Sequence, residues 1–195
     1  KATGLSYVES IFNEANGQGL NTPLNEFWNA WQDLANNPGG IPERTALLGK
    51  AEVLSQQFNT MSESLQQIIR DMDTNLEGGL AELNQTTAQI ASLNAKIVAA
   101  ESSGTSANDL RDQRNTLLEK LSGLIGTQFY ETENGSLTVM TSDGHPLVDG
   151  SVAWGFSQDD LSTRLTGGKI GAWLDIRDEI VPQYLANLDE LAGTL

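Results

Sequence analysis

Residues 54–72, which read LSQQFNTMSESLQQIIRDM, decide the architecture of this chain. The large apolar side chains in this stretch are spaced 4, 3, 4, 3 and 4 residues apart, which is the heptad spacing of a helix packed along one seam. They are Leu54, Phe58, Met61, Leu65, Ile68 and Met72. The stretch therefore predicts a helix with one buried face.

The apolar pattern continues after a step that shifts its phase. The further members are Leu76, Leu80, Leu83, Ile90, Leu93 and Ile97. Because no proline lies between Pro42 and Glu101, we predict one long helix between these residues. Gly78-Gly79 interrupts it at a cost of about 1 kcal/mol per glycine relative to alanine, so the alternative is two antiparallel halves.

Two shorter helices are predicted in front of the long one. Residues 5–16 carry apolar side chains at helical spacing. In the next helix, Thr22 is suited to the N-cap and Pro23 to the first turn. Trp28 and Trp31 share the apolar face of this second helix, so we predict that they pack in the core, with stacking on sugars as the alternative.

A fold-back helix is predicted from Asn108 to Gly126, antiparallel to the long helix. The apolar period then changes to 2, and Asn134-Gly135 predicts a two-residue hairpin turn. This turn places Tyr130 opposite Val139 and Thr132 opposite Leu137.

Further strands are predicted around Leu147-Val148, with Pro146 suited to an edge strand, and over residues 152–156. Gly167-Gly168 precedes a last helix, which Pro182 should kink or divide.

The predicted fold is mainly α, an elongated helical bundle with one long helix and a small antiparallel β-meander. We expect a single rod domain over 1–195, with a helical bundle at 1–125, the meander at 126–157 and a returning helix at 168–195. The chain begins with Lys1 and the apolar pattern still runs at Leu191, so we expect a piece of a longer protein.

The composition excludes several classes of function. The chain has 195 residues, 11 basic and 26 acidic side chains, and a net charge of -15. This charge argues against nucleic acid and against an anionic membrane surface as partners. No apolar run approaches the ~20 residues of a membrane span. The absence of cysteine excludes thiolate nucleophiles, zinc knuckles and disulfides.

No catalytic or metal-binding pattern in the sequence is complete. His145, the only histidine, follows a predicted turn without the Gly-x-Ser-x-Gly elbow of a serine hydrolase. Gly167-Gly168-Lys169 lacks the remaining positions of a phosphate-binding loop. The carboxylates from Asp71 to Glu82 approach a calcium loop, but Leu76 stands where glycine is needed. We therefore predict no catalytic residue, metal site or cofactor.

A second stripe follows the long helix opposite its apolar seam. Its members are Gln56, Thr60, Glu63, Gln67, Arg70 and Thr74. Such a stripe is either a solvated face or a subunit-contact surface. The pattern alone therefore favours a structural or assembly protein, and the alternative is a soluble coiled-coil adaptor or a secretion-chaperone-like binding module.

Three segments occur in the order typical of flagellar hook-associated proteins and resemble that family. They are FWNAWQDLANNP at 27–38, NDLRDQR at 108–114 and GGKIGAWLDIRD at 167–178. The resemblance implies a flagellin-like inner rod domain and a structural subunit of the bacterial flagellum that forms the junction between hook and filament. It implies an extracellular location, reached through the flagellar secretion apparatus, without enzyme activity or a cofactor.

The resemblance also implies a set of partners. They are the hook protein, a second hook-associated junction protein, further copies of the full-length protein in a ring, and an export chaperone bound through segments absent from this sequence. The family's terminal axial segments are absent too, so we expect that this stretch does not polymerise alone.

Overall fold

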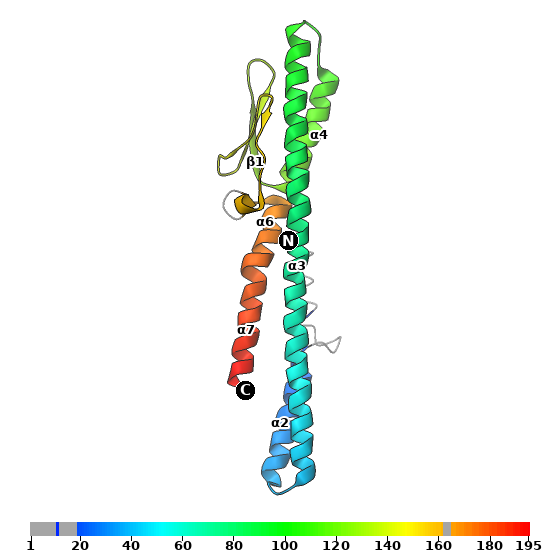
Figure 1. The fold of residues 1–195 in the computed structure, drawn as a ribbon, viewed down its shortest axis with the longest axis vertical. Helices are drawn as coiled ribbons and strands as arrows, with labels where there is room; N and C mark the ends of the chain where they lie inside the picture. The colour runs from blue at the N-terminus through cyan, green and yellow to red at the C-terminus, as the bar shows by residue number, and fades with distance from the viewer. Residues whose placement is uncertain (1–10, 12–18, 162–164) are drawn as a thin grey trace. The chain divides into compact units, whose positions relative to one another are not determined.

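The structure is a computed structural model that describes residues 11, 19–161 and 165–195. The helix predicted over residues 5–16 therefore lies almost wholly outside the described residues. The helices are α2 (Asn21–Asn36), α3 (Ile41–Ser102), α4 (Asn108–Leu124), α6 (Gly168–Leu174) and α7 (Val181–Thr194). The strands are β1 (Thr127–Glu131), β2 (Leu137–Thr141), β3 (Pro146–Asp149) and β4 (Val152–Ala153). This confirms the predicted mainly α fold with one long helix and a small antiparallel sheet (Figure 1).

The chain divides into two compact units, residues 1–71 with 176–195, and residues 72–175. Helix α3 contributes its first half to one unit and its second half to the other. None of the described helices is long and apolar enough to cross a membrane.

Helix α3 stays continuous through Gly78-Gly79, so the two-halves alternative is wrong. Gly79 is buried, and a Cβ built there would lie 2.8 Å from Trp173 Cζ3 and 3.3 Å from Ile170 Cγ1. Gly78 has open space around it. The first glycine is thus a tolerated weak point, whereas the second lets α6 pack closely against α3.

Helix α3 buries four of the six side chains of the seam that residues 54–72 predict, and Phe58 and Met72 are half-buried. Leu54, Met61, Leu65 and Ile68 are buried. An ion pair between Glu26 of α2 and Lys50 of α3, with an Oε2–Nζ distance of 2.8 Å, joins the two helices.

Helix α2 departs from the prediction in two ways. It begins at Asn21 and has no side-chain cap, so Thr22 is not its N-cap. Trp28 and Trp31 are 51% and 46% exposed, so their predicted place in the core is wrong. The buried residue of α2 is Ala30, which at about 100° per residue faces roughly 160° and 100° away from the two tryptophans. Phe27 instead contacts both indole rings edge-on.

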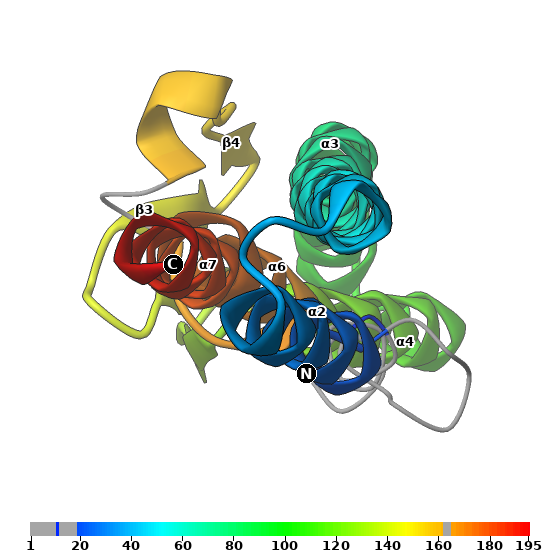
Figure 2. The same ribbon diagram turned by 90° about the horizontal axis from the view of Figure 1, so that it is seen from below.

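In the second unit, α4 folds back antiparallel on α3, as predicted. Glu101 pairs with Arg111 near one end of α4, and Glu82 pairs with Lys120 near the other. Figures 1 and 2 show α4 beside α3 in both views. The core between the helices and the sheet is apolar and includes Leu83, Ile90, Leu121, Val139 and Leu147, each fully buried.

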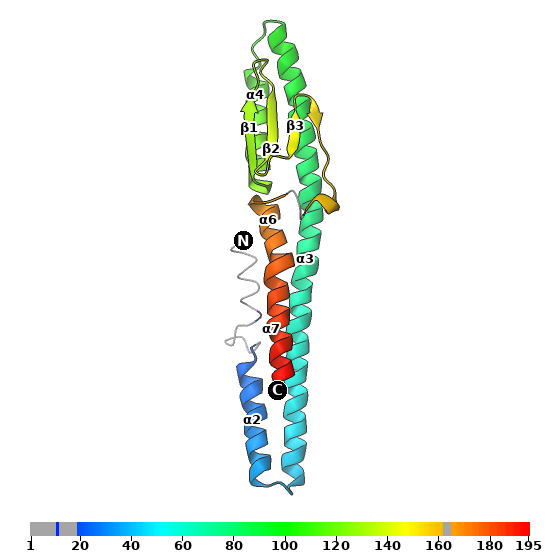
Figure 3. The ribbon, with the colours of Figure 1, turned by 90° about the vertical axis from the view of Figure 1, so that its left-hand side faces the viewer.

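The four strands form an antiparallel meander in the order β1-β2-β3-β4 (Figure 3). The predicted register is wrong by one residue, because Phe129 and not Tyr130 lies opposite Val139. The backbone N–H of Thr132 donates to Ser136 O, so the hairpin loop has three residues, and Gly135 takes a φ of +81°. A three-residue loop with glycine in this conformation is the next most common hairpin after the two-residue turn.

The last two strands also differ from the prediction. Pro146 begins β3, which pairs with both β2 and β4 and is not an edge strand. The predicted strand over residues 152–156 is reduced to the two residues of β4, and a 3-10 turn (Gln158–Asp160) follows it.

The last helical segment is divided, as Pro182 predicts. Between α6 and α7, residues Asp175–Ile180 form a π-helical turn. Proline supplies no backbone N–H and clashes with the preceding turn, so a regular α-helix cannot run through this point. Pro182 therefore sits in the first turn of α7, where its missing N–H costs little.

Candidate functional site

The most elaborate polar arrangement of the described residues fixes the sheet to the α3–α4 pair, and Asn94 is its centre. This side chain is fully buried on α3. Its Nδ2 donates to Leu137 O and to Gly150 O, both at 2.8 Å. Its Oδ1 accepts from Leu137 N at 3.1 Å and from Arg114 Nη1 at 2.9 Å. One uncharged amide thus uses all its hydrogen-bonding capacity to hold the start of β2, the turn after β3 and Arg114 of α4.

Asn84 repeats this arrangement ten residues earlier on α3. Its Nδ2 donates to Phe156 O at 2.8 Å, and its Oδ1 accepts from Phe156 N at 2.9 Å. The side chain therefore pairs with a backbone peptide as a neighbouring strand would. Because a buried peptide without partners is costly, Asn84 fixes the place where the chain leaves the sheet.

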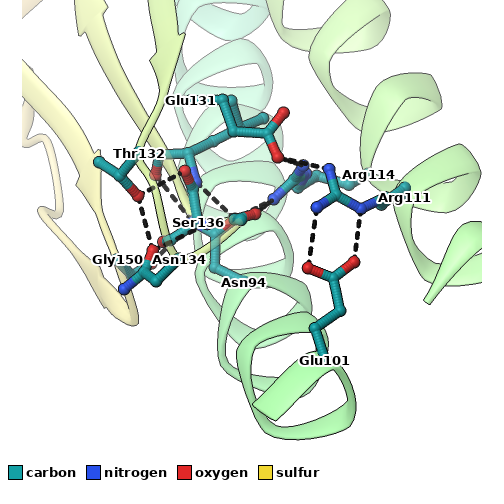
Figure 4. Close-up of polar contacts among 11 residues, drawn as sticks. Asn94, Glu101, Arg111, Arg114, Glu131, Thr132, Asn134, Ser136 and Gly150 are labelled. Carbon is teal, nitrogen blue, oxygen red and sulfur yellow. Dashed lines mark hydrogen bonds and ion pairs between the residues drawn. The ribbon is translucent and has the colours of Figure 1, made fainter. Parts of the chain in front are cut away.

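Arg114 of α4 is buried, with 2% of its side chain exposed (Figure 4). Its Nη1 donates to Gly135 O at 2.8 Å, and its Nη2 lies 3.8 Å from Glu131 Oε1. Burial lowers the pKa of Arg114 from its ordinary value, and the charge of Glu131 opposes that shift. The guanidinium therefore holds the hairpin loop and stays charged beside a carboxylate.

Arg111 lies one turn before Arg114 and forms the outer part of the network. Its Nε and Nη2 donate to the two carboxylate oxygens of Glu101 at 2.8 and 2.9 Å, and its Nη1 donates to Glu131 (Figure 4). The hydrogen bond from Arg111 lowers the pKa of Glu101. The hydrogen bonds to Glu101 and Glu131 raise the pKa of Arg111. One cation thus links α3, α4 and β1.

The side chains of this network hold the helices and the sheet in place. The amides, guanidinium groups and carboxylates bind one another and the backbone, whereas Arg114 Nε and Ser136 Oγ are buried without a hydrogen-bond partner among the described residues. The network presents no nucleophile beside a base. Within the described ranges, no group of three or more His, Asp or Glu side chains is placed to hold a metal ion. The arrangement can therefore brace the sheet against the helices.

The predicted subunit-contact stripe keeps the exposure that its pattern implies. All six members lie on α3 and are exposed: Gln56, Thr60, Glu63, Gln67, Arg70 and Thr74. Gln67 Oε1 accepts from Arg70 at 2.6 and 3.0 Å, and Gln67 Nε2 donates to Asp71 Oδ1 at 2.7 Å. The stripe therefore presents an ordered set of amides and charges to its surroundings.

The other patterns that the sequence singles out lie apart from one another. His145 follows β2, and its backbone N–H donates to Thr141 Oγ1. Asp71 and Asp73 lie on continuous α3, where their side chains diverge by about 160° and cannot surround a cation. Gly168 has a φ of +59°, and a Cβ there would lie 2.5 Å from Leu124 O. The glycine pair thus permits a close approach of α6 to α4.

The residues that build the network do not stand out in the sequence pattern. Arg114 stands at an apolar position of α4, where a charged residue within a buried stripe is the available signal. Asn94 offers a similar signal, because it follows Leu93 and precedes Ile97 within the apolar pattern. The partners of both are backbone groups of the hairpin, and no side-chain pattern encodes those.

The family model described as the flagellar hook-associated protein FlgK helical domain matches residues 5–157. The chain belongs to the FlgK helical-domain family. The flagellar hook-associated protein 1 of Bacillus subtilis is 33% identical over 149 residues, which cover 76% of this chain and 29% of that protein. The protein of the same name from Salmonella typhimurium is 30% identical over 179 residues, covering 90% of this chain and 32% of that protein.

A solved structure has the same fold as this FlgK-family chain. The flagellar hook junction protein FlgK from Burkholderia pseudomallei matches with a TM-score of 0.78 and 26% identity, over 95% of this chain and 39% of that one. The chain spans about a third of the length of the curated relatives it matches.

The segments that carry the family resemblance have separate places in the fold. Residues 27–38 cover most of α2 and the turn after it, and residues 108–114 open α4. The second segment contains both Arg111 and Arg114, so the part of α4 that resembles the family is also the part that holds the sheet. Residues 167–178 contain α6.

Proposed function

We propose that this chain is part of a structural subunit of the bacterial flagellum and forms the junction between hook and filament. The observation that carries the proposal is the match of the FlgK helical-domain model to residues 5–157, together with relatives named flagellar hook-associated protein 1. A braced sheet on a helix pair, without a catalytic arrangement in the part of the chain described, supports a mechanical role.

In this proposal the protein acts outside the cell as a part of the flagellum, without enzyme activity or cofactor, and reaches that place through the flagellar secretion apparatus. Its partners are the hook protein, a second hook-associated junction protein and further copies of itself in a ring. An export chaperone would bind segments outside this sequence. Residues 1–125, 126–157 and 168–195 would serve this assembly as one domain.

The exposed stripe on α3 is the subunit contact that we propose. Its exposure and its ordered amides support this role, since polar rims and water-mediated hydrogen bonds are common in protein interfaces. Reversing Glu63 and Arg70 together in the full-length protein should weaken assembly while the monomer keeps its helical circular dichroism. Unchanged ring assembly in this double variant would exclude the stripe as the contact.

The decisive experiment for the proposed function is deletion of the whole gene in the organism that encodes it. Negative-stain electron microscopy of the cell surface should then show hooks without filaments, with flagellin lost to the medium. Restoring the gene should restore the filaments. Normal filaments in the deletion strain would exclude the junction role and favour a soluble adaptor.

A further inference from the structure

A groove of about 450 Å³ lies between α3 and α4 in the unit of residues 72–175. Helix α3 lines it with Gln89, Ser92, Leu93 and Lys96, and α4 with Gln113, Thr116 and Leu117. Leu93 is nearly buried and Leu117 is half-buried, so these two side chains form an apolar floor. The amide, hydroxyl and ammonium groups stand around it.

The groove faces away from the sheet. Asn94 points to the sheet, and at about 100° per residue Ser92 and Lys96 point roughly 160° away from it. On α4, Thr116 points about 160° away from Arg114, which also holds the sheet. The network that braces the sheet therefore leaves the opposite side of the helix pair exposed.

The charge of the groove is unusual for this protein. The chain carries 26 acidic side chains, yet none lines the groove. Lys96 is exposed and forms no ion pair within the described ranges. Because the net charge is -15, two copies repel each other at most points of contact. A groove with a cation and without carboxylates is a place where an acidic face of another copy can approach.

We propose that this groove receives the ridge Thr60–Gln67 of α3 from a second copy of the chain, with Glu63 directed toward Lys96. Glu63 is exposed and, like Lys96, forms no ion pair among the residues described. The inference rests on the proposed function, because it names the partner of the α3 stripe within an assembly of identical subunits.

The dimensions and chemistry of the two surfaces match. The ridge runs from Thr60 to Gln67 and the α3 wall of the groove from Gln89 to Lys96, so each covers about 10 Å of helix. The amides and hydroxyls on both sides can exchange hydrogen bonds directly or through water. The methylene stems of Glu63 and Gln67 can cover the apolar floor while their polar ends reach the rim.

The pairing is heterologous, because ridge and groove are different surfaces. A bound pair keeps one free groove on one copy and one free ridge on the other, so a further copy can add at either end. Head-to-tail contacts of this kind produce a closed ring when the rotation between copies closes. A symmetric dimer would instead use the same surface twice.

Cross-linking in the full-length protein tests the pairing directly. This stretch has no cysteine, so Glu63→Cys and Lys96→Cys introduce defined thiols. A short bis-maleimide applied to intact flagella of the doubly substituted strain should produce a ladder of covalent oligomers. Each single variant should not produce a ladder, and Glu190→Cys with Lys96→Cys is the matched control. A ladder no stronger than this control would overturn the pairing.

Charge reversal provides the second test. Glu63→Lys and Lys96→Glu should each lower the association constant between subunits, by up to about fivefold for the loss of an exposed ion pair, and should lower the fraction of filament-bearing cells. The double reversal should restore the fraction, and each purified variant should keep its circular dichroism. A double variant no better than either single one would overturn the pairing.

The two proposals fail differently. If the wild-type gene restores filaments in the deletion strain but neither the ladder nor the rescue is observed, the ridge–groove pairing is wrong and the junction role stands. If the deletion strain keeps normal filaments, both proposals fall.

Discussion

The two halves of α3 hold their neighbours by different means. From residue 41 to 71 the buried side chains of the helix are apolar, and the seam of Leu54, Met61, Leu65 and Ile68 follows a heptad spacing. From residue 72 to 102 the helix also buries Asn94, Thr86 and Thr87, and Asn84 reaches the backbone of the sheet. A helix can pack against a helix through apolar contacts, whereas an irregular loop presents peptide groups that need polar partners.

Because of this difference, we expect the buried residues in the second half of α3 to tolerate fewer substitutions than those in the first half. Apolar packing tolerates substitutions of similar volume. A buried amide that serves several peptide groups does not, because removal leaves all its partners unsatisfied. The following variants test this contrast between the two halves.

The largest effect is expected for Asn94→Ala. It would leave Leu137 and Gly150 without their partner and the buried Arg114 with one acceptor fewer. We expect a loss of about 3–5 kcal/mol in the free energy of unfolding, measured by urea denaturation. Asn59→Ala, an exposed asparagine in the first half, should cost far less. Equal losses would remove the contrast between the halves.

The apolar half is tested by Leu65→Ala, with Trp31→Ala for comparison. Leu65 is fully buried, and we expect its truncation to cost about 2–5 kcal/mol. Trp31 is 46% exposed, so its truncation should cost only about 1 kcal/mol, despite the larger side chain. Denaturant midpoints of the two variants give the answer. A larger loss for Trp31→Ala would mean that α2 packs more tightly than its exposure indicates.

Alanine substitutions at Gly78 and Gly79 should change the free energy of unfolding in opposite directions. Gly79→Ala should cost about 1–3 kcal/mol, because its methyl group would meet Trp173 at 2.8 Å. Gly78→Ala should gain about 0.5–1 kcal/mol, because the space around it is open and alanine favours helix. Thermal unfolding followed by circular dichroism separates the two. A stabilising Gly79→Ala would contradict the close approach of α6.

The smallest expected effect concerns pH. The pKa of Glu101 is lowered in the folded protein by its hydrogen bond to Arg111. The stabilisation is therefore present above the ordinary pKa of a glutamate and is lost as the pH falls through the lowered value. Glu101→Gln should remove this acid-side loss from the pH profile of the denaturation midpoint. Glu119→Gln, an exposed substitution on α4, should leave the profile unchanged, and identical profiles for both variants would contradict the assignment.

The regular part of this fold follows from the sequence. Pro42 and Glu101 lie one residue inside the observed ends of α3, because the apolar pattern and the absence of proline describe a local property of the helix. The fold-back of α4 is equally local, since a short turn after Ser102 permits only a nearby antiparallel neighbour. The six members of the polar stripe are exposed, as a face opposite the seam requires. Their role as a subunit contact stays a prediction.

The remaining features depend on contacts between distant residues. Asn134-Gly135 is compatible with loops of two and three residues, and the longer loop places Gly135 O where Arg114 binds it. The sequence shows an apolar face on α2, yet Trp28 and Trp31 on that face are exposed, because burial depends on packing partners that the pattern of one helix does not contain. The network around Asn94 has the same origin, because its partners are peptide groups of the sheet.

The bonds from Asn84 and Asn94 to the sheet have a consequence for the order of folding. They join residues that are 72, 56 and 43 positions apart, whereas a helical turn joins residues four apart. Closing such long loops costs chain entropy before any bond forms. We therefore expect the antiparallel helix pair of α3 and α4 to form first and the β-meander to pack against it late. Phe156 should be among the last residues to bind its partner, Asn84. The hydrogen bonds of Asn84 and Asn94 would then form in the last steps of folding, after the local helical contacts.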